Sequence, residues 1–243
     1  MSTNILFIFE GARAEEQIVE NLQKSFFAVK DKIITTSVYG AEIYQIYKEI
    51  SADEDLDTFN LIKARNPNKE KLRNFVRNDF AEIFMFFDYE GHSPTADDEK
   101  LKELLEFFNN ETDKGKLYIS YPMVESLKHI SCHASFRDLN VICKEKIDYK
   151  NIVTDNCLKE LQDLTRYDIN TWKQITETHL KKMNYIVFDL FEFPQKIVSQ
   201  DLIFSRQIEK YISNEKPTVA VLSAFPVFIH DYYGNQRTRN LIY

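Results

Sequence analysis

Two short apolar runs limit the folds open to this chain more than any other feature of its sequence. The first run, NILFIF, covers residues 4–9, and the second, EIFMFF, covers residues 82–87. A continuous apolar run of this length is typical of a strand that is buried on both faces, as in a parallel sheet covered by helices. The two runs therefore favour an α/β fold with a parallel sheet.

Strand-like and helix-like segments alternate through the first half of the chain. Such alternation predicts βαβ units, in which parallel strands are joined by right-handed crossovers. Residues 51–68 are acidic and then mixed in character, and we expect a mostly exposed connection there. Besides the two apolar runs, the pattern predicts strands at 32–39 and 116–120 and helices at 14–27, 41–50, 69–80 and 95–109.

Helical periodicity dominates the second half of the chain, after about residue 125. Residues 156–182 and 200–213 are predicted helices, whereas 218–223 fits either a strand or the start of a buried helix. We therefore expect an α/β domain over residues 1–130, followed by a mainly helical region over residues 131–243 that packs on it.

Glycine is scarce and widely spaced. Only five of the 243 residues are glycine. Dinucleotide-binding and phosphate-binding loops need glycines a few positions apart, because their backbone approaches phosphate closely. The chain by itself is therefore neither a Rossmann dehydrogenase nor a P-loop NTPase. Two of the glycines, Gly11 and Gly91, directly follow acidic residues, where we expect sharp turns that let a phosphate approach.

The remaining composition is that of an ordinary soluble globular protein, with 44% hydrophobic and 28% charged residues. Three cysteines, none of them in a C-x-x-C pair, argue against a secreted disulfide framework. No basic amino-terminal segment is followed by a long apolar run, and no apolar stretch is long enough to span a bilayer. We expect a cytoplasmic protein without membrane contact.

The net charge of −7 bears on the partners of the chain. Nucleic-acid-binding surfaces rely on Lys and Arg to neutralise phosphates, so an acidic balance usually counts against them. That inference weakens where the acids cluster around a metal, because a bound cation presents positive charge to the substrate. The position of the acids therefore matters more than their number.

Both apolar runs end in acidic residues. Glu10 directly follows the first run, and Asp88 and Glu90 follow the second. Open α/β sheets bind ligands at the carboxyl ends of their strands, and residues two apart in extended backbone point to the same side. If the two strands are neighbours, the three carboxylates share one crevice, where like charges need a proton or a cation between them. Each acid alone also fits a solvated strand end, so the prediction of a Mg²⁺ site for phosphate chemistry depends on the joint pattern.

Two further motifs nominally suit other metal chemistry. Asp98-Glu99-Lys100 has the D-x-K form of restriction-type nucleases, but it falls in the first turn of a predicted helix, where acids favour the helix dipole. His129, Cys132 and His133 have side chains that suit zinc, but no second Cys/His cluster follows at finger spacing. We therefore interpret the first motif as a solvated helix start and the histidines as core or surface residues.

A family resemblance joins these observations. EGARAE at residues 10–15, followed by an amphipathic helix, resembles the E-G-x-x-x-E opening of TOPRIM domains, particularly those of RloB-like and OLD-like nucleases. DYE at 88–90 falls where those domains have D-x-D, with glutamate in place of the second aspartate. YPMVE at 121–125 is similar to the Pro-x-x-Glu segment that follows in RloB-like proteins. The resemblance covers roughly residues 4–130 and implies a TOPRIM-like parallel sheet flanked by helices.

The resemblance also implies roles for individual residues. Glu10 looks like the general acid/base, and Glu10, Asp88 and Glu90 together would form the catalytic and metal-binding set for Mg²⁺, or for Mn²⁺ in its place. Weaker assignments follow from the same resemblance: Glu15 and Glu125 as further metal ligands, and Arg13 as a contact to substrate phosphate at the start of a helix.

Such domains imply metal-dependent cleavage of phosphodiester bonds in DNA or RNA, including transfer RNA. RloB-like and OLD-like proteins resemble toxin-like effectors of bacterial anti-phage defence, often accompanied by an ATPase. Because this chain lacks a P-loop, an ABC-type or AAA-type ATPase would have to be a partner protein. Assembly into a homo-oligomer is a further expectation.

Two other functions remain open at this point. One is a non-catalytic TOPRIM-like scaffold that holds a partner ATPase in check. The other is a haloacid-dehalogenase-like phosphatase, because Asp88-Tyr89-Glu90-Gly91 also resembles the D-x-D-G motif of that family, in which the first aspartate is the nucleophile. That motif normally follows the first strand of the core, whereas here it follows a later strand, and Glu10 would have no role.

Overall fold

The computed structural model describes residues 4–11, 13–27, 34–53 and 55–243, and the side chain of Arg13 lies outside this description. The chain divides into two compact units. The first comprises Met1–Asp88 and Asp97–Leu117, and the second comprises Tyr89–Ala96 and Tyr118–Tyr243.

A mostly parallel five-stranded sheet organises the fold, which confirms the expected α/β class. Its strands lie in the order β2-β1-β3-β5-β4. Strand β1 is central to the parallel part and pairs in parallel with both β2 and β3, whereas the short β4 is antiparallel to β5. The strands are β1 (Asn4–Phe9), β2 (Ile34–Val38), β3 (Phe80–Asp88), β4 (Asn109–Asn110) and β5 (Gly115–Ser120).

The two apolar runs form the buried centre of this sheet, as predicted. Residues 5–9 of β1 are fully excluded from solvent, and β3 is buried from Ile83 onward. The rings of Phe7 and Phe84 meet edge to face, with centroids 5.8 Å apart, and Phe9 stacks on Phe86 at 5.4 Å. These cross-strand aromatic pairs hold β1 and β3 in register.

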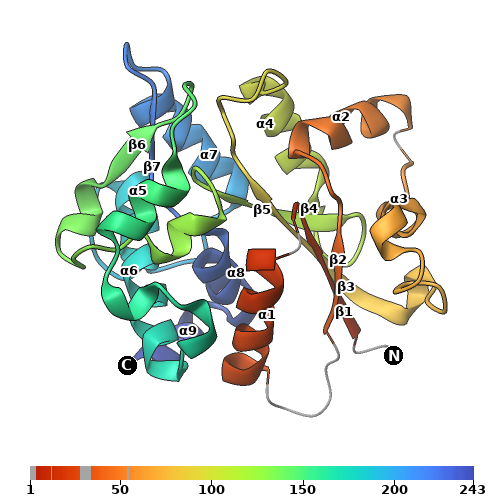
Figure 1. The fold of residues 1–243 in the computed structure, drawn as a ribbon, viewed down its shortest axis with the longest axis horizontal. Helices are drawn as coiled ribbons and strands as arrows, with labels where there is room; N and C mark the ends of the chain where they lie inside the picture. Colours follow the sequence, from red (N-terminus) through yellow and green to blue (C-terminus); the bar gives the residue numbers. More distant parts are fainter. Residues whose placement is uncertain (1–3, 12, 28–33, 54) are drawn as a thin grey trace. The chain divides into compact units, whose positions relative to one another are not determined.

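Four helices of the first unit flank the strands (Figure 1). Helices α1 and α4 match the amphipathic patterns at 14–27 and 95–109 closely, and the side chain of Asp97 caps α4 by accepting from the backbone N–H groups of Glu99 and Lys100. Helix α2 packs against α4. The four are α1 (Arg13–Phe26), α2 (Ile43–Ala52), α3 (Thr58–Ala64) and α4 (Asp98–Phe107).

Residues 51–80 differ from the prediction. The expected exposed connection contains α3, whose Phe59 and Ile62 are buried, and the expected helix at 69–80 is a series of turns that ends in the short η2 (Arg77–Asp79). The side chain of Asn68, at the end of η1 (Asn66–Asn68), explains part of this. It accepts from the N–H of Val38 and donates to the carbonyls of Val38 and Ile62, so it pairs with the edge of β2 as a strand would.

The backbone carbonyls that a helix at 69–80 would need for its own hydrogen bonds also have another partner. The ammonium of Lys63 donates to the backbone oxygens of Arg73 and Phe75, at 3.2 and 2.6 Å. A side chain from α3 thus satisfies groups that a continuous helix would have paired internally.

The second unit is mainly helical, as expected for the carboxyl-terminal part of the chain. A two-stranded antiparallel ribbon joins β6 (Asn140–Ile142) to β7 (Thr218–Ala220). Around it lie the helices α5 (Tyr149–Asn156), α6 (Ile169–Phe188), α7 (Gln200–Gln207), α8 (Ala224–Tyr233) and α9 (Asn235–Ile242), and the shorter turns η3 (Val124–Lys128), η4 (Ser135–Asp138), η5 (Lys159–Leu161), η6 (Leu164–Arg166) and η7 (Ile208–Ile212).

The predicted helix at 156–182 is wrong at its amino-terminal end. Helix α5 stops at Asn156, and α6 begins only at Ile169. Between them, the carboxylates of Asp163 and Asp168 accept from the backbone N–H groups of Thr165 and Thr171, and each starts a new helical turn. Residues 218–220 are the strand β7, which resolves the ambiguity at 218–223.

Within the described part of the chain, none of the helices combines the length and the apolar character needed to cross a bilayer.

Candidate metal centre

Strands β1 and β3 end side by side, which satisfies the condition set by the sequence pattern. Phe9 pairs with Phe86, and the backbone N–H of Glu10 continues this ladder to the carbonyl of Phe86 at 3.2 Å. On the other side, the carbonyl of Glu10 accepts from the N–H of Gly40 after β2. Glu10 is thus held by backbone hydrogen bonds in the bend directly after β1, between the ends of β2 and β3.

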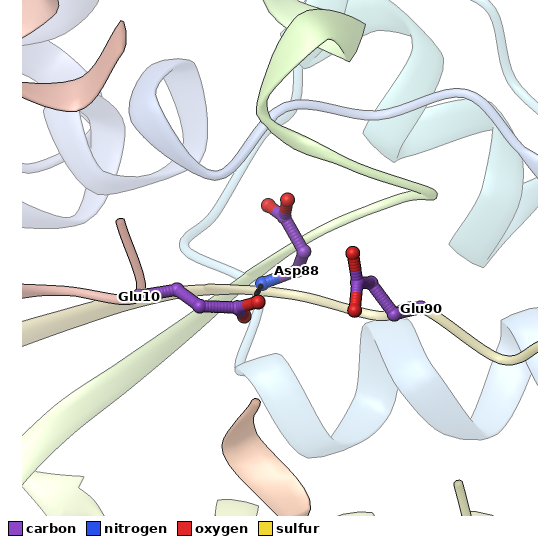
Figure 2. A group of neighbouring side chains, drawn as sticks. All are labelled: Glu10, Asp88 and Glu90. Atoms are coloured by element: carbon purple, nitrogen blue, oxygen red, sulfur yellow. Dashed lines mark hydrogen bonds between the residues drawn. The ribbon is translucent and has the colours of Figure 1, made fainter. Parts of the chain in front are cut away.

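The three predicted acids form one cluster. One carboxylate oxygen from each of Glu10, Asp88 and Glu90 lies within 4.8 Å of the other two, and no other such group of acidic, histidine or cysteine side chains occurs among the described residues. Figure 2 shows the side chains of Glu10 and Glu90 extending toward each other beside Asp88. Asp88 is 8% exposed.

A main-chain hydrogen bond fixes one member of the cluster. The backbone N–H of Asp88 donates to Oε2 of Glu10 at 3.2 Å. This bond satisfies a donor at the end of β3 and orients the carboxylate of Glu10 toward the same place as the side chain of Asp88. The sequence pattern contains no signal for it, because it depends on the register of two strands far apart in the chain.

The spacing of the cluster fits a divalent cation. Ligand oxygens lie about 2.1 Å from Mg²⁺, so two oxygens on one ion are at most about 4.2 Å apart. A group with oxygens within 4.8 Å of one another reaches that geometry through small side-chain rotations. Three carboxylates this close repel one another, and a cation between them removes that cost.

The weaker site assignments lie outside the three-acid group. Glu15 is 8% exposed in the first turn of α1, and its carboxylate oxygen lies 3.4 Å from the position that a Cβ on Gly11 would take. A Cβ at position 11 would therefore be in ordinary van der Waals contact with that carboxylate. Glu125 lies in η3, where Lys150 is 3.5 Å from its Oε1 and its buried Oε2 accepts no hydrogen bond from the described part of the chain. The side chain of Arg13 is outside the described residues.

The alternative metal motifs do not form a site in the described part of the chain. His129 is buried, and its Nδ1 pairs with the hydroxyl of Tyr149 at 3.0 Å, while burial lowers the pKa of His129 to about 4. His133 is bonded instead to Thr178 on α6. Asp98 and Glu99 occupy the first turn of α4, as expected of a solvated helix start. Cys143 is buried, and Cys157 is partly exposed.

The turn after Asp88 has features that the sequence pattern does not predict. Glu90 has a φ of +37°, which is uncommon for a residue with a side chain. The backbone N–H groups of Tyr89 and Glu90 both donate to the carbonyl of Pro122, at 3.1 and 3.3 Å. The YPMVE motif therefore contributes its backbone to the turn, a role that no residue type reveals.

No protein-family model, curated protein or solved structure matches this chain.

Proposed function

We propose that this chain is a divalent-metal-dependent nuclease that hydrolyses phosphodiester bonds, with a TOPRIM-like catalytic domain. The observation that carries the proposal is the convergence of Glu10, Asp88 and Glu90 within 4.8 Å of one another at the carboxyl ends of two parallel strands. This edge is where open α/β sheets bind their ligands. Three oxygen donors at one point suit a hard cation and a phosphate substrate.

The three acids have different roles in the proposed reaction. Asp88 and Glu90 would hold the ion, and a Mg²⁺ or Mn²⁺ ion bound there would polarise the phosphoryl oxygen and lower the pKa of a water. Glu10, oriented by the N–H of Asp88, would also contact the ion; once substrate takes the place of that contact, its carboxylate would accept the proton of the attacking water and return it to the leaving oxygen. The cation also offsets the negative field that a chain of net charge −7 presents to nucleic acid.

A partner ATPase and a role in anti-phage defence belong to the same proposal, since both follow from the resemblance to RloB-like and OLD-like nucleases. Because the given sequence contains no P-loop, the ATPase in this proposal would be a separate protein. Co-expression with a candidate ATPase, followed by purification of a complex, tests this part separately from catalysis.

The direct test is cleavage of DNA and RNA by the purified chain in Mg²⁺ or Mn²⁺. We expect cleavage that EDTA abolishes and that Asp88→Ala lowers by about 10²-fold or more, the scale on which loss of a transition-state interaction acts. Glu99→Ala is the matched control, because Glu99 is an exposed acid on α4 that pairs with Lys102. Cleavage that survives both EDTA and Asp88→Ala contradicts the proposal.

Two further outcomes would distinguish the nuclease from the scaffold and from the phosphatase. If the chain binds Mn²⁺ through these acids but cleaves no nucleic acid, and a Glu10→Ala variant keeps full biological activity, the non-catalytic role is correct instead. A phosphoaspartate on Asp88 after incubation with a phosphate ester identifies the phosphatase.

A further inference from the structure

Tyr89 lies between two acids of the cluster but faces a different environment. Its side chain is fully buried. The ring centroid is 5.8 Å from that of Tyr121 and 6.0 Å from that of Phe204, and these two rings stack on each other. The ammonium of Lys144 lies 5.4 Å from the centre of the Tyr89 ring. These aromatic and cation contacts restrict where the ring can lie.

The backbone of Tyr89 is fixed as firmly as its ring. Its N–H donates to two carbonyls, those of Ser120 at 3.0 Å and Pro122 at 3.1 Å. The next N–H, from Glu90, also reaches the carbonyl of Pro122. Glu90 can therefore keep its positive φ, because its neighbours determine the path of the chain on both sides.

Gly91 shows how closely the chain folds back over the ring. A Cβ at this position would lie 2.5 Å from Cε1 of Tyr89 and 2.9 Å from the backbone oxygen of Cys143. Its φ is not among the positive glycine values, so the position needs glycine for space and not for backbone freedom. This differs from the expected reason, the approach of a phosphate.

We propose that Tyr89 is a positioning residue: its buried ring anchors the turn that holds Glu90 in the left-handed conformation and aims the Glu90 carboxylate at the metal. The inference rests on the proposed function, since it gives the carboxylate of Glu90 a metal to bind. Tyr89 itself touches neither metal nor substrate. It acts through the backbone of Glu90, as residues behind metal ligands commonly do.

The test compares the Mn²⁺ affinity of four variants of the full chain, measured by electron paramagnetic resonance below each unfolding temperature. Tyr89→Leu removes the ring, and Gly91→Ala keeps the ring but displaces it. Tyr89→Phe keeps the ring and removes only the hydroxyl. Tyr149→Leu is the matched control, because Tyr149 is also buried in the second unit and contacts His129 instead of this turn.

We expect Tyr89→Leu and Gly91→Ala to weaken Mn²⁺ binding by about 10-fold or more, as loss of a residue behind a ligand does. Tyr89→Phe should bind Mn²⁺ with the same affinity as the wild-type chain. Tyr149→Leu should lower the unfolding temperature but leave the affinity unchanged. If Tyr149→Leu weakens binding as much as Tyr89→Leu, or if Tyr89→Leu has no effect, the positioning role is wrong.

The outcomes also separate this inference from the proposed function. Metal binding that depends on Tyr89 in a chain that cleaves no nucleic acid supports the positioning role and contradicts the nuclease. Cleavage and metal binding that both ignore Tyr89→Leu contradict the positioning role and leave the nuclease standing. A wild-type chain that does not bind Mn²⁺ contradicts both.

Discussion

The backbone N–H of Asp88 donates a hydrogen bond to Oε2 of Glu10, at 3.2 Å and across 78 positions of sequence. This bond joins the ends of β1 and β3 through a side chain that is itself a proposed metal ligand. The orientation of Glu10 is thereby set by the sheet before any cation binds. Such preorganisation lowers the cost of collecting three like charges around one ion.

The first prediction concerns stabilisation by metal. A ligand that binds only the folded chain raises the free energy of unfolding, by about 2.7 kcal/mol at a concentration 100 times its dissociation constant. We expect Mg²⁺ to raise the unfolding temperature of the wild-type chain and to have a much smaller effect on Glu10→Gln. Glutamine keeps an oxygen for the N–H of Asp88 but loses the charge. Differential scanning fluorimetry with and without Mg²⁺ makes the comparison, and equal shifts for both chains would falsify it.

The second prediction concerns acid stability. His179 is fully buried, its Nδ1 accepts from the N–H of Ser223, and its Nε2 faces the carbonyl of Leu127. The neutral ring with its proton on Nε2 satisfies both contacts, and burial lowers the pKa of His179 to about 3. Because the folded pKa lies below the unfolded value, the unfolded chain binds more protons as the pH falls below about 6.5. Stability is therefore retained above that pH and lost below it.

We expect His179 alone to lower the free energy of unfolding by about 2 kcal/mol between pH 7 and pH 5. Urea unfolding at both values measures it. His179→Gln should make the dependence shallower, although His129, whose pKa burial also lowers, keeps part of it, whereas Phe136→Leu should not, because it removes a ring that packs against His179 at 4.8 Å but no titrating group. An unchanged slope in His179→Gln contradicts the assignment.

The third prediction concerns the edge of β2. Asn68 is 1% exposed and makes three hydrogen bonds to the backbone of Val38 and Ile62. Asn68→Ala removes the partner of the N–H and carbonyl of Val38, while the carbonyl of Ile62 keeps the N–H of Arg65, and we expect a loss of about 2–4 kcal/mol in the free energy of unfolding. Asn66→Ala, at an exposed position in the same short helix, should cost under about 0.5 kcal/mol. Similar losses in the two variants, measured by urea unfolding, would show that the bonds of Asn68 do not matter.

Sequence patterns predicted the parts of the fold that depend on continuous or periodic burial. The runs at 4–9 and 82–87 form neighbouring buried strands, because this pairing removes their apolar side chains from water. The prediction failed at 69–80, where the bonds of Asn68 and Lys63 to distant backbone groups replace a helix. Periodicity carries no information about such contacts, because each depends on a single polar side chain.

The sequence likewise predicts one part of the candidate site and not another. The acids Glu10, Asp88 and Glu90 could be selected from the sequence, because each follows a strand and the carboxyl ends of parallel strands meet. The anchoring role of Tyr89 could not be predicted from the sequence, since a tyrosine between two acids resembles an ordinary aromatic residue at a strand end. Its partners Tyr121 and Phe204 come from distant positions and are brought together only by the folded chain.

We propose that one divalent cation binds between the three acids, and anomalous diffraction from a crystal grown in Mn²⁺ would reveal it. We expect a Mn²⁺ peak about 2.2 Å from carboxylate oxygens of Glu10, Asp88 and Glu90, a distance typical of oxygen ligands. The same peak should be absent in Asp88→Ala. Clear density for the three side chains with no Mn²⁺ between them, at saturating metal, would show that these acids form no metal site.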